Sequence, residues 1–254
     1  MPTPMSSAYQ DAYDSLLREL EKNPGANPET MAAFWPMSGH GYHGDLMVIG
    51  QATNGWEGQI DVQQLKYPDY RTRVMKKARA VADSGICNLA TRCPMLWVTD
   101  QWQDKRKNAT GKSPFWRVIR EVVDRLNLGD VNTDDWPSAL AWSNLYKVAP
   151  KDGGNPVQRF RAGQEPGVFD LLKREVEEFA PRRVLVLTGL DLFAPFAAHA
   201  GLALIPESGP VVEAHAIVDN THWIVARYPS RLPKDLTEII FADYIARAFW
   251  RQSG

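Results

Sequence analysis

Short apolar runs that stop at a glycine most constrain how this chain can fold. Leu46–Ile49 ends on Gly50, and Arg183–Thr188 ends on Gly189 before an amphipathic helix at 190–200. Apolar runs of this length are typical of strands buried on both faces, as in a parallel sheet covered by helices. The strand–glycine–helix step is typical of doubly wound folds. We therefore predict an α/β fold, a three-layer α/β/α sandwich with a short, mainly parallel central sheet.

The periodicity of apolar residues also predicts the individual elements. Helical spacing occurs at 9–21, 69–82, 114–128, 167–179, 190–200 and 234–250. Central strands are expected at Leu46–Ile49, Leu140–Tyr146, Val184–Leu187 and Trp223–Ala226, with a further strand at Val211–Val218. Glycine, proline and polar content predicts loops at 29–44 and 151–166 and irregular chain at 84–112. No linker divides the sequence, so we expect one domain over 1–254, with 1–44 as a helix and loop extension.

Composition excludes several classes of protein. The 254 residues include nine Trp, eight Tyr and nine Phe, too many aromatic residues for a disordered chain. With 29 basic and 30 acidic residues the net charge is −1, which excludes a uniformly basic nucleic-acid coat but allows a local basic face. Two cysteines support neither a disulfide framework nor, unaided, an iron–sulfur cluster. No apolar run approaches the roughly 18 residues of a membrane helix, and the first 20 residues lack a signal-peptide core. We therefore expect a cytoplasmic protein with no membrane partner.

Common cofactor and metal motifs are incomplete in this sequence. Gly111-Lys112-Ser113 resembles the end of a phosphate-binding loop, but Arg106 stands where that motif needs its first glycine. The histidine and cysteine spacings are too wide, and their number too small, for a zinc site. There is no nucleophile elbow and no dinucleotide fingerprint. We therefore expect no cofactor, no metal and no iron–sulfur cluster.

Three segments join a predicted strand to a loop that carries polar side chains. They are 48–58, 142–150 and 224–231. In a parallel sheet the carboxyl ends of the strands share one edge, and ligands bind at that edge. If the three strands are parallel neighbours, their loops converge on one cleft. We expect Gln51, Asn144 and Tyr228 to line it.

These segments resemble the motifs of the uracil-DNA glycosylase superfamily, in order and in spacing. Gly50–Glu57 (GQATNGWE) resembles the family's GEAPGxxE loop, and Ser143–Pro150 (SNLYKVAP) is similar to a strand ending TNVVKCRPP. Tyr228–Ser230 (YPS) takes the place of the family's His-Pro-Ser. Pro181–Gly189 (PRRVLVLTG) resembles the family's pattern P-x-x-[IV]-[IV]-x-[LV]-G, a strand that ends on a glycine before a helix. Ser113–Ile119 (SPFWRVI) resembles a segment of the mismatch-specific branch. The resemblance spans roughly 45–250.

The resemblance implies an enzyme that hydrolyses the N-glycosidic bond of a base flipped out of DNA. The transition state is oxocarbenium-like, and the protein positions water, stacks a ring on the base, reads the base edge and stabilises the leaving base. The partner would be DNA, single-stranded or base-damaged, or a free nucleobase. Residues implied to be catalytic are Gln51, Glu57 and Tyr228. Residues implied to bind substrate are Gly50, Ala52, Asn54, Trp56, Asn144, Lys147, Pro229, Ser230 and Arg231.

The chemistry of the catalytic positions departs from the family. Gln51 orients water but cannot take its proton, and a tyrosine such as Tyr228 stays neutral at pH 7 with a pKa near ~10. Glu57 is the only carboxylate of the first loop. Three hypotheses stay open: a divergent glycosylase, a binding module that holds a base or nucleotide without hydrolysis, and an unrelated α/β protein. We expect uracil excision to be weak or absent while binding persists.

Several single residues have two interpretations. Asn144 offers one donor and one acceptor in a plane, which suits the reading of a base edge, but an Asn at a strand end also ties turns. Trp56, Trp102 and Tyr67 are candidate stacking rings, or parts of the core. The basic run Arg71–Arg79 would track phosphates, or form a solvated helix face.

Overall fold

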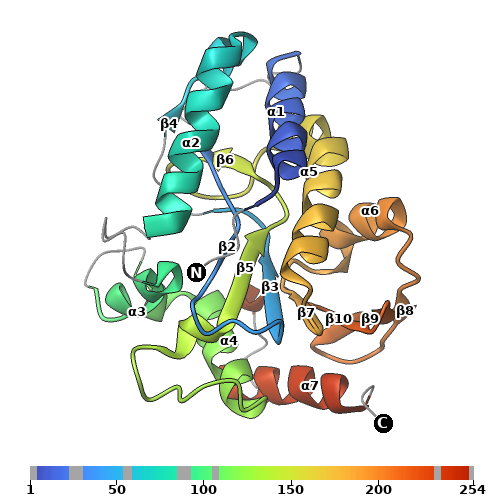
Figure 1. Ribbon diagram of the computed structural model, residues 1–254. Coiled ribbons are helices and arrows are strands. Elements are labelled where there is room, and N and C mark those ends of the chain that lie inside the picture. Colours follow the sequence, from blue (N-terminus) through green and yellow to red (C-terminus); the bar gives the residue numbers. More distant parts are fainter. Residues whose placement is uncertain are drawn as a thin grey trace.

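The computed structural model describes residues 5–22, 31–53, 59–84, 93–104, 109–231 and 236–251. Within them the main sheet has seven strands, which extend from the centre to the right side of Figure 1. Their spatial order is β2 (Met37–Ser38), β5 (Leu140–Asn144), β3 (Leu46–Gly50), β7 (Arg183–Val186), β10 (Thr221–Ala226), β9 (Val212–Val218) and β8 (Ile205–Pro206).

The predicted central strands are confirmed as β3, β5, β7 and β10, and each pairs in parallel with its neighbours among them. Gly50 lies opposite Asn144 in the β3–β5 register, and Ile49 lies opposite Val186 of β7. The outer pairs β2–β5, β9–β10 and β8–β9 are antiparallel. The sheet is therefore mixed, and the prediction of a mainly parallel sheet is corrected at its edges.

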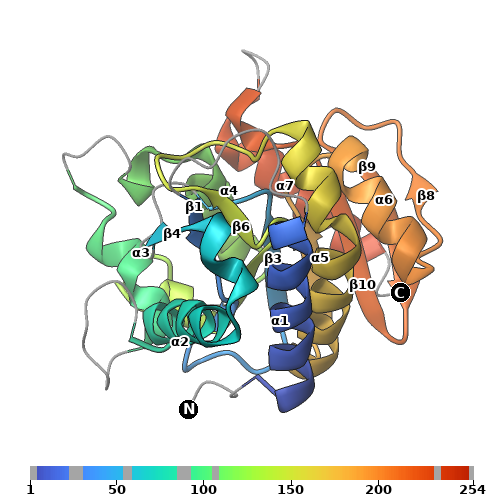
Figure 2. The ribbon, with the colours of Figure 1, turned by 90° about the horizontal axis from the view of Figure 1, so that it is seen from above.

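Helices cover the sheet and pack in pairs. Helix α1 (Ser7–Lys22) packs on α5 (Gln158–Phe179), and α4 (Pro114–Arg125) packs on α7 (Glu238–Arg251). Helix α6 (Leu190–Ala200) contacts β10, where the Phe193 ring lies 5.9 Å from the Trp223 ring between centroids. Figure 2 shows α2 (Pro68–Ser84) beside α1. The α/β class is thus confirmed. Among the described residues, no helix has both the length and the apolarity that crossing a membrane requires.

A second, smaller sheet lies where a loop was predicted. Its described strands are β4 (Gln59–Ile60), β1 (Met31–Ala33) and β6 (Val148–Pro150), all antiparallel, with β1 in the middle. Together with β2, this sheet shows that the prediction of loop over 29–44 is wrong. The small apolar residues of β1 are fully buried, so its backbone groups must find partners on both sides. Those partners come from distant segments.

Helix α5 also differs from prediction, because it begins at Gln158 and continues through Pro166. The Gln164 amide is fully buried, donates to the Val148 carbonyl at 2.8 Å and accepts from the Val148 N–H at 3.0 Å. At Gly167, an added Cβ would lie 3.0 Å from the Leu16 side chain, so this glycine allows α1 and α5 to approach closely. The prediction of a loop up to residue 166 is therefore wrong from Gln158 onward.

The predicted irregular stretch 84–112 holds short helical pieces in its described parts. They are a 3-10 turn at Pro94–Leu96, helix α3 (Trp97–Asp100) and a 3-10 turn at Thr110–Lys112. The Trp97 and Trp116 rings meet edge to face at 5.4 Å, so α3 is tied to α4 by aromatic packing rather than by helical periodicity of its own.

A buried ion pair joins the first sheet to two helices. The Lys147 amine lies 2.8 Å from the Glu175 carboxylate of α5, and both side chains are wholly inaccessible to solvent. The same amine donates to the Ser143 hydroxyl at 2.7 Å and to the Asn144 carbonyl at 2.6 Å. Tyr9 of α1 donates to Glu175 at 2.7 Å. Burial lowers the pKa of Lys147, and burial together with the charge of Glu175 raises the pKa of Tyr9.

A second ion pair fixes α2 against α1. Arg71 is 6% exposed, and its guanidinium binds Asp14 of α1 at 2.7 Å and the Leu65 carbonyl at 2.8 Å. Partial burial alone would raise the pKa of the Asp14 carboxyl, but hydrogen bonds from Arg71 and Arg18 outweigh it and hold that pKa below its usual value. Arg71 is therefore structural, which corrects its place in a phosphate-tracking run.

Replacing Lys147 by Met should destabilise the protein strongly, because Glu175 would lose its cationic partner in an interior that solvent does not reach. Removing one partner of a buried pair typically costs about 3–5 kcal/mol of unfolding free energy. The double variant Lys147→Met/Glu175→Gln should recover part of that loss, since no isolated charge remains. Urea unfolding of the wild type, both single variants and the double variant measures the coupling. Additive losses would show that the two charges do not interact.

Stability should fall in acid partly through Asp14. Its folded pKa lies below the unfolded value of about 3.9, so its contribution is fully present above that value and is lost as pH falls through the folded pKa. Asp14→Asn should therefore be less stable than wild type at pH 6 and lose less stability below pH about 4. Urea unfolding across this pH range tests the expectation. Glu19→Gln, in the exposed Lys22–Glu19 pair of the same helix, is the control and should lower stability at pH 6 much less than Asp14→Asn does.

Candidate functional site

The carboxyl ends of the parallel strands form one braced edge. The Leu145 N–H, just past β5, donates to the Gly50 carbonyl at 2.8 Å, and the next N–H donates to the Gln51 carbonyl at 2.9 Å. Past β7, the Gly189 N–H donates to the Ala226 carbonyl of β10 at 3.0 Å. The predicted motifs therefore begin at neighbouring points of one sheet edge, held there by main-chain bonds.

Asn144 is the most distinctive polar side chain at this edge. It is 1% exposed, and within the described residues its side-chain nitrogen Nδ2 has no hydrogen-bond partner. Ser143, the preceding residue, bonds Glu175 of α5, so Asn144 points to the other face of the sheet. A buried amide donor without an acceptor is uncommon and costs stability. A ligand with a carbonyl oxygen would satisfy it.

Gly50 and Phe115 complete the surroundings of this amide. A Cβ added to Gly50 would lie 2.5 Å from Asn144 Oδ1 and 3.2 Å from Phe115 Cζ, so only glycine fits there. Phe115 belongs to the first turn of α4 and is 8% exposed. The sequence analysis included Phe115 in the segment Ser113–Ile119 but not among the site residues, because its contact with Gly50 and Asn144 arises from tertiary packing.

Gln51 braces three loops. Its side-chain Nε2 donates to the Thr188 carbonyl after β7 at 2.9 Å, and its Oε1 accepts from Asn155 at 2.7 Å. The amide is half-buried and committed at both ends. Beside it, Ala52 is half-buried against the core, and the Thr53 hydroxyl is buried without a partner in the described part of the chain.

The third motif follows β10. Tyr228 is 37% exposed, Pro229 is buried and Ser230 is exposed. Burial raises the pKa of the Tyr228 phenol, which keeps it a neutral hydrogen-bond donor at pH 7. The parallel strands bring this motif to the same edge as Gln51 and Asn144. That the three side chains line one cleft stays a prediction.

Lys147 does not fit its predicted role in substrate binding. Its amine has no exposed surface, and Ser143, Glu175 and the Asn144 carbonyl take up its donors. This prediction is corrected: the lysine after the strand is drawn inward by a carboxylate on α5. Sequence could not reveal this, because Glu175 lies 28 positions away in the chain.

Other predicted residues are placed only in part. Asn54, Trp56 and Glu57, and the side chain of Arg231, lie outside the described residues. Trp102 packs edge to face on Trp136 at 5.9 Å and is partly buried against the core. Tyr67 is 55% exposed, just before α2.

Glu213 is a carboxylate at this edge that the sequence did not single out. Its Oε2 accepts from the Leu190 N–H at 2.8 Å, which caps the start of α6, and its Oε1 lies 3.3 Å from Arg227 Nε. It stands near the start of β9, whose antiparallel pairing with β10 carries it to the carboxyl edge. Within the described ranges, no three His, Cys, Asp or Glu side chains gather as metal ligands would.

No protein-family model matches the chain, and no curated protein matches it.

Gly50→Ala should destabilise the protein and disturb the Asn144 amide, because the new methyl group meets a buried side chain at 2.5 Å. Overpacking of this kind typically costs about 1–3 kcal/mol. Gly129→Ala is the matched control, since its Cβ would have its nearest neighbour at 3.9 Å. Thermal unfolding of both variants measures the difference. Equal melting temperatures for the two variants would contradict the close approach at Gly50.

Proposed function

We propose that this protein binds a nucleobase at the carboxyl edge of its parallel strands, as a divergent relative of the uracil-DNA glycosylase superfamily with that family's three-layer α/β/α fold. The observation that carries the proposal is the buried Asn144 amide, whose Nδ2 has no partner among the described residues. The ligand is a base flipped out of DNA, or a free base.

A nucleobase suits the groups around this amide. Its edge carries carbonyl oxygens and ring N–H groups in one plane, which a primary amide matches with one donor and one acceptor. Gly50 leaves the main chain bare beside the amide, and Phe115 supplies an aromatic ring at the same place. Stacking of an aromatic side chain on a base is typically worth about 1–3 kcal/mol. Specific recognition thus needs no charged group.

Hydrolysis has weaker support than binding. A general base typically contributes about 10²–10⁴-fold to the rate, and the neutral Gln51 amide, held by Thr188 and Asn155, cannot supply one. Glu213 is already committed to Arg227 and to the start of α6. Glu57 is the remaining carboxylate of the first motif. We therefore propose base binding with weak or absent excision of uracil.

Asn144→Asp should weaken base binding about tenfold or more, because it replaces the free donor by an acceptor and adds a buried charge. Asn144→Ala should weaken it in the same direction. Binding is measured by fluorescence anisotropy on labelled single strands that carry uracil, hypoxanthine or an abasic site. Asn220→Asp is the matched control, since it makes the same change in the exposed hairpin turn at the opposite edge of the sheet.

The same oligonucleotides report excision through strand cleavage after alkali. We expect little or no product with the wild type. Robust turnover that disappears in Glu57→Gln would show that Glu57 acts as the base and that the protein is an active glycosylase. The proposed site would be refuted if affinity were the same for every base in the oligonucleotide and did not change in the Asn144 variants.

A further inference from the structure

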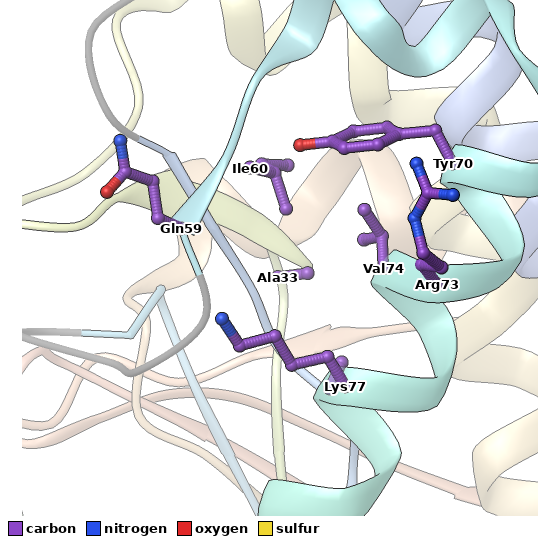
Figure 3. Close-up of a pocket in the computed structure, with 8 residues that line it drawn as sticks. Ala33, Gln59, Ile60, Tyr70, Arg73, Val74 and Lys77 are labelled. Atoms are coloured by element: carbon purple, nitrogen blue, oxygen red, sulfur yellow. The ribbon is translucent and has the colours of Figure 1, made fainter.

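A separate pocket of about 230 Å³ opens between α2 and the small sheet. Figure 3 shows the Tyr70 ring extending from α2 toward Ile60 and the Lys77 side chain reaching from the same helix toward β4. Among the residues that the structure describes, those lining it are Ala33, Gln59, Ile60, Tyr70, Arg73, Val74, Lys77 and Ala78. Asn144 is not one of them, whereas Arg73 and Lys77 belong to the basic run Arg71–Arg79.

Helical spacing explains why α2 presents both apolar and cationic groups here. Positions 70, 74 and 78, and positions 73 and 77, are one turn apart, so they share one face of the helix. Ile60, Val74 and Ala78 are buried and form an apolar floor with Ala33. Tyr70 is positioned by the Asp61 N–H, which donates to its hydroxyl at 2.8 Å.

The cations at this pocket differ from Arg71 and Arg79 of the same helix, which pair with carboxylates. Arg71 pairs with Asp14 and Arg79 pairs with Asp83 at 3.4 Å. Arg73 and Lys77 are exposed and have no carboxylate within 4.0 Å among the described residues. Arg73 lies over the Tyr70 ring, 5.4 Å from its centre. Two positive charges thus stand over an apolar floor, with no counter-ion in the part of the chain that the structure describes.

We infer that this pocket binds a phosphate ester, with the phosphate between Arg73 and Lys77 and the organic part against the apolar floor. The pocket volume of about 230 Å³ is below the roughly 300–1,000 Å³ of common ligand sites. The pocket therefore has room for no more than one nucleotide unit. The choice of a nucleotide rests on the proposed function. Gln59 follows Thr53 by six residues, so the pocket lies within about 20 Å of the carboxyl edge along the chain. One short strand could therefore reach both sites.

Calorimetric titration with thymidine 5′-monophosphate tests the pocket. Arg73→Gln/Lys77→Gln should weaken binding about tenfold or more, because both phosphate donors lose their charge. Lys76→Gln/Arg79→Gln removes the same charge from α2 outside the pocket and should leave affinity unchanged. Thymidine and inorganic phosphate should each bind the wild type at least about tenfold more weakly than the nucleotide.

Several outcomes would overturn the inference. They are no binding of the nucleotide, equal weakening by the two double variants, and inorganic phosphate binding as tightly as the nucleotide. Loss of binding in Asn144→Ala alone would place the nucleotide at the carboxyl edge instead, refuting the pocket and supporting the proposed function. A different pattern would refute the proposed function but not the pocket. In it, Arg73→Gln/Lys77→Gln weakens binding of the nucleotide, while Asn144→Ala leaves binding of the uracil-containing oligonucleotides unchanged.

A titration with oligothymidylate separates a strand from a free nucleotide. If the pocket holds a phosphate of a strand, Arg73→Gln/Lys77→Gln should reduce the slope of log K against log salt by about 0.7 per lost contact. An unchanged slope, together with weakened binding of the mononucleotide, would assign the pocket to free nucleotides.

Discussion

The buried pair of Lys147 and Glu175 is the interaction on which the rest of the structure depends. It gathers α1, α5 and β5 around two charges that no solvent reaches. Burying both charges is costly, and only their contact at 2.8 Å and the surrounding hydroxyl and carbonyl groups offset that cost. Because Lys147 also holds the Asn144 carbonyl, the pair fixes the backbone of Asn144 while its amide points to the other face of the sheet.

The small sheet links the two proposed binding regions. The first motif leads from β3 to β4, and the second leads from β5 to β6. Both β4 and β6 pair with β1, so the chain leaving each motif is anchored to the same strand. Ala33 at the end of β1 and Gln59 of β4 then line the pocket beneath α2. A ligand bound in the pocket would therefore contact β1 and β4, and β1 also anchors the chain that leaves the carboxyl edge through β6.

The polar groups described at the carboxyl edge suit recognition better than proton transfer. The Asn144 and Gln51 amides and the Tyr228 phenol are neutral at pH 7, so they are suited to orienting a ligand by hydrogen bonds rather than to moving its protons. The Glu213 carboxylate there is already bound to Arg227 and to the start of α6. The proposed separation of binding from hydrolysis thus follows from the side chains themselves.

The sequence by itself determined the elements that depend on local patterns. The central strands, helices α1 and α6 and strand β9 were all predicted, because apolar periodicity and glycines act within a few residues. Tertiary structure decided what distant partners control. Strand β1 needed β4 and β6, the start of α5 needed the contact of Gln164 with Val148, and Arg71 needed Asp14. The inward position of Lys147 and the position of Phe115 beside Asn144 also depend on distant partners. Contacts between residues far apart in the chain leave no periodic pattern in the sequence, so they could not be predicted from it.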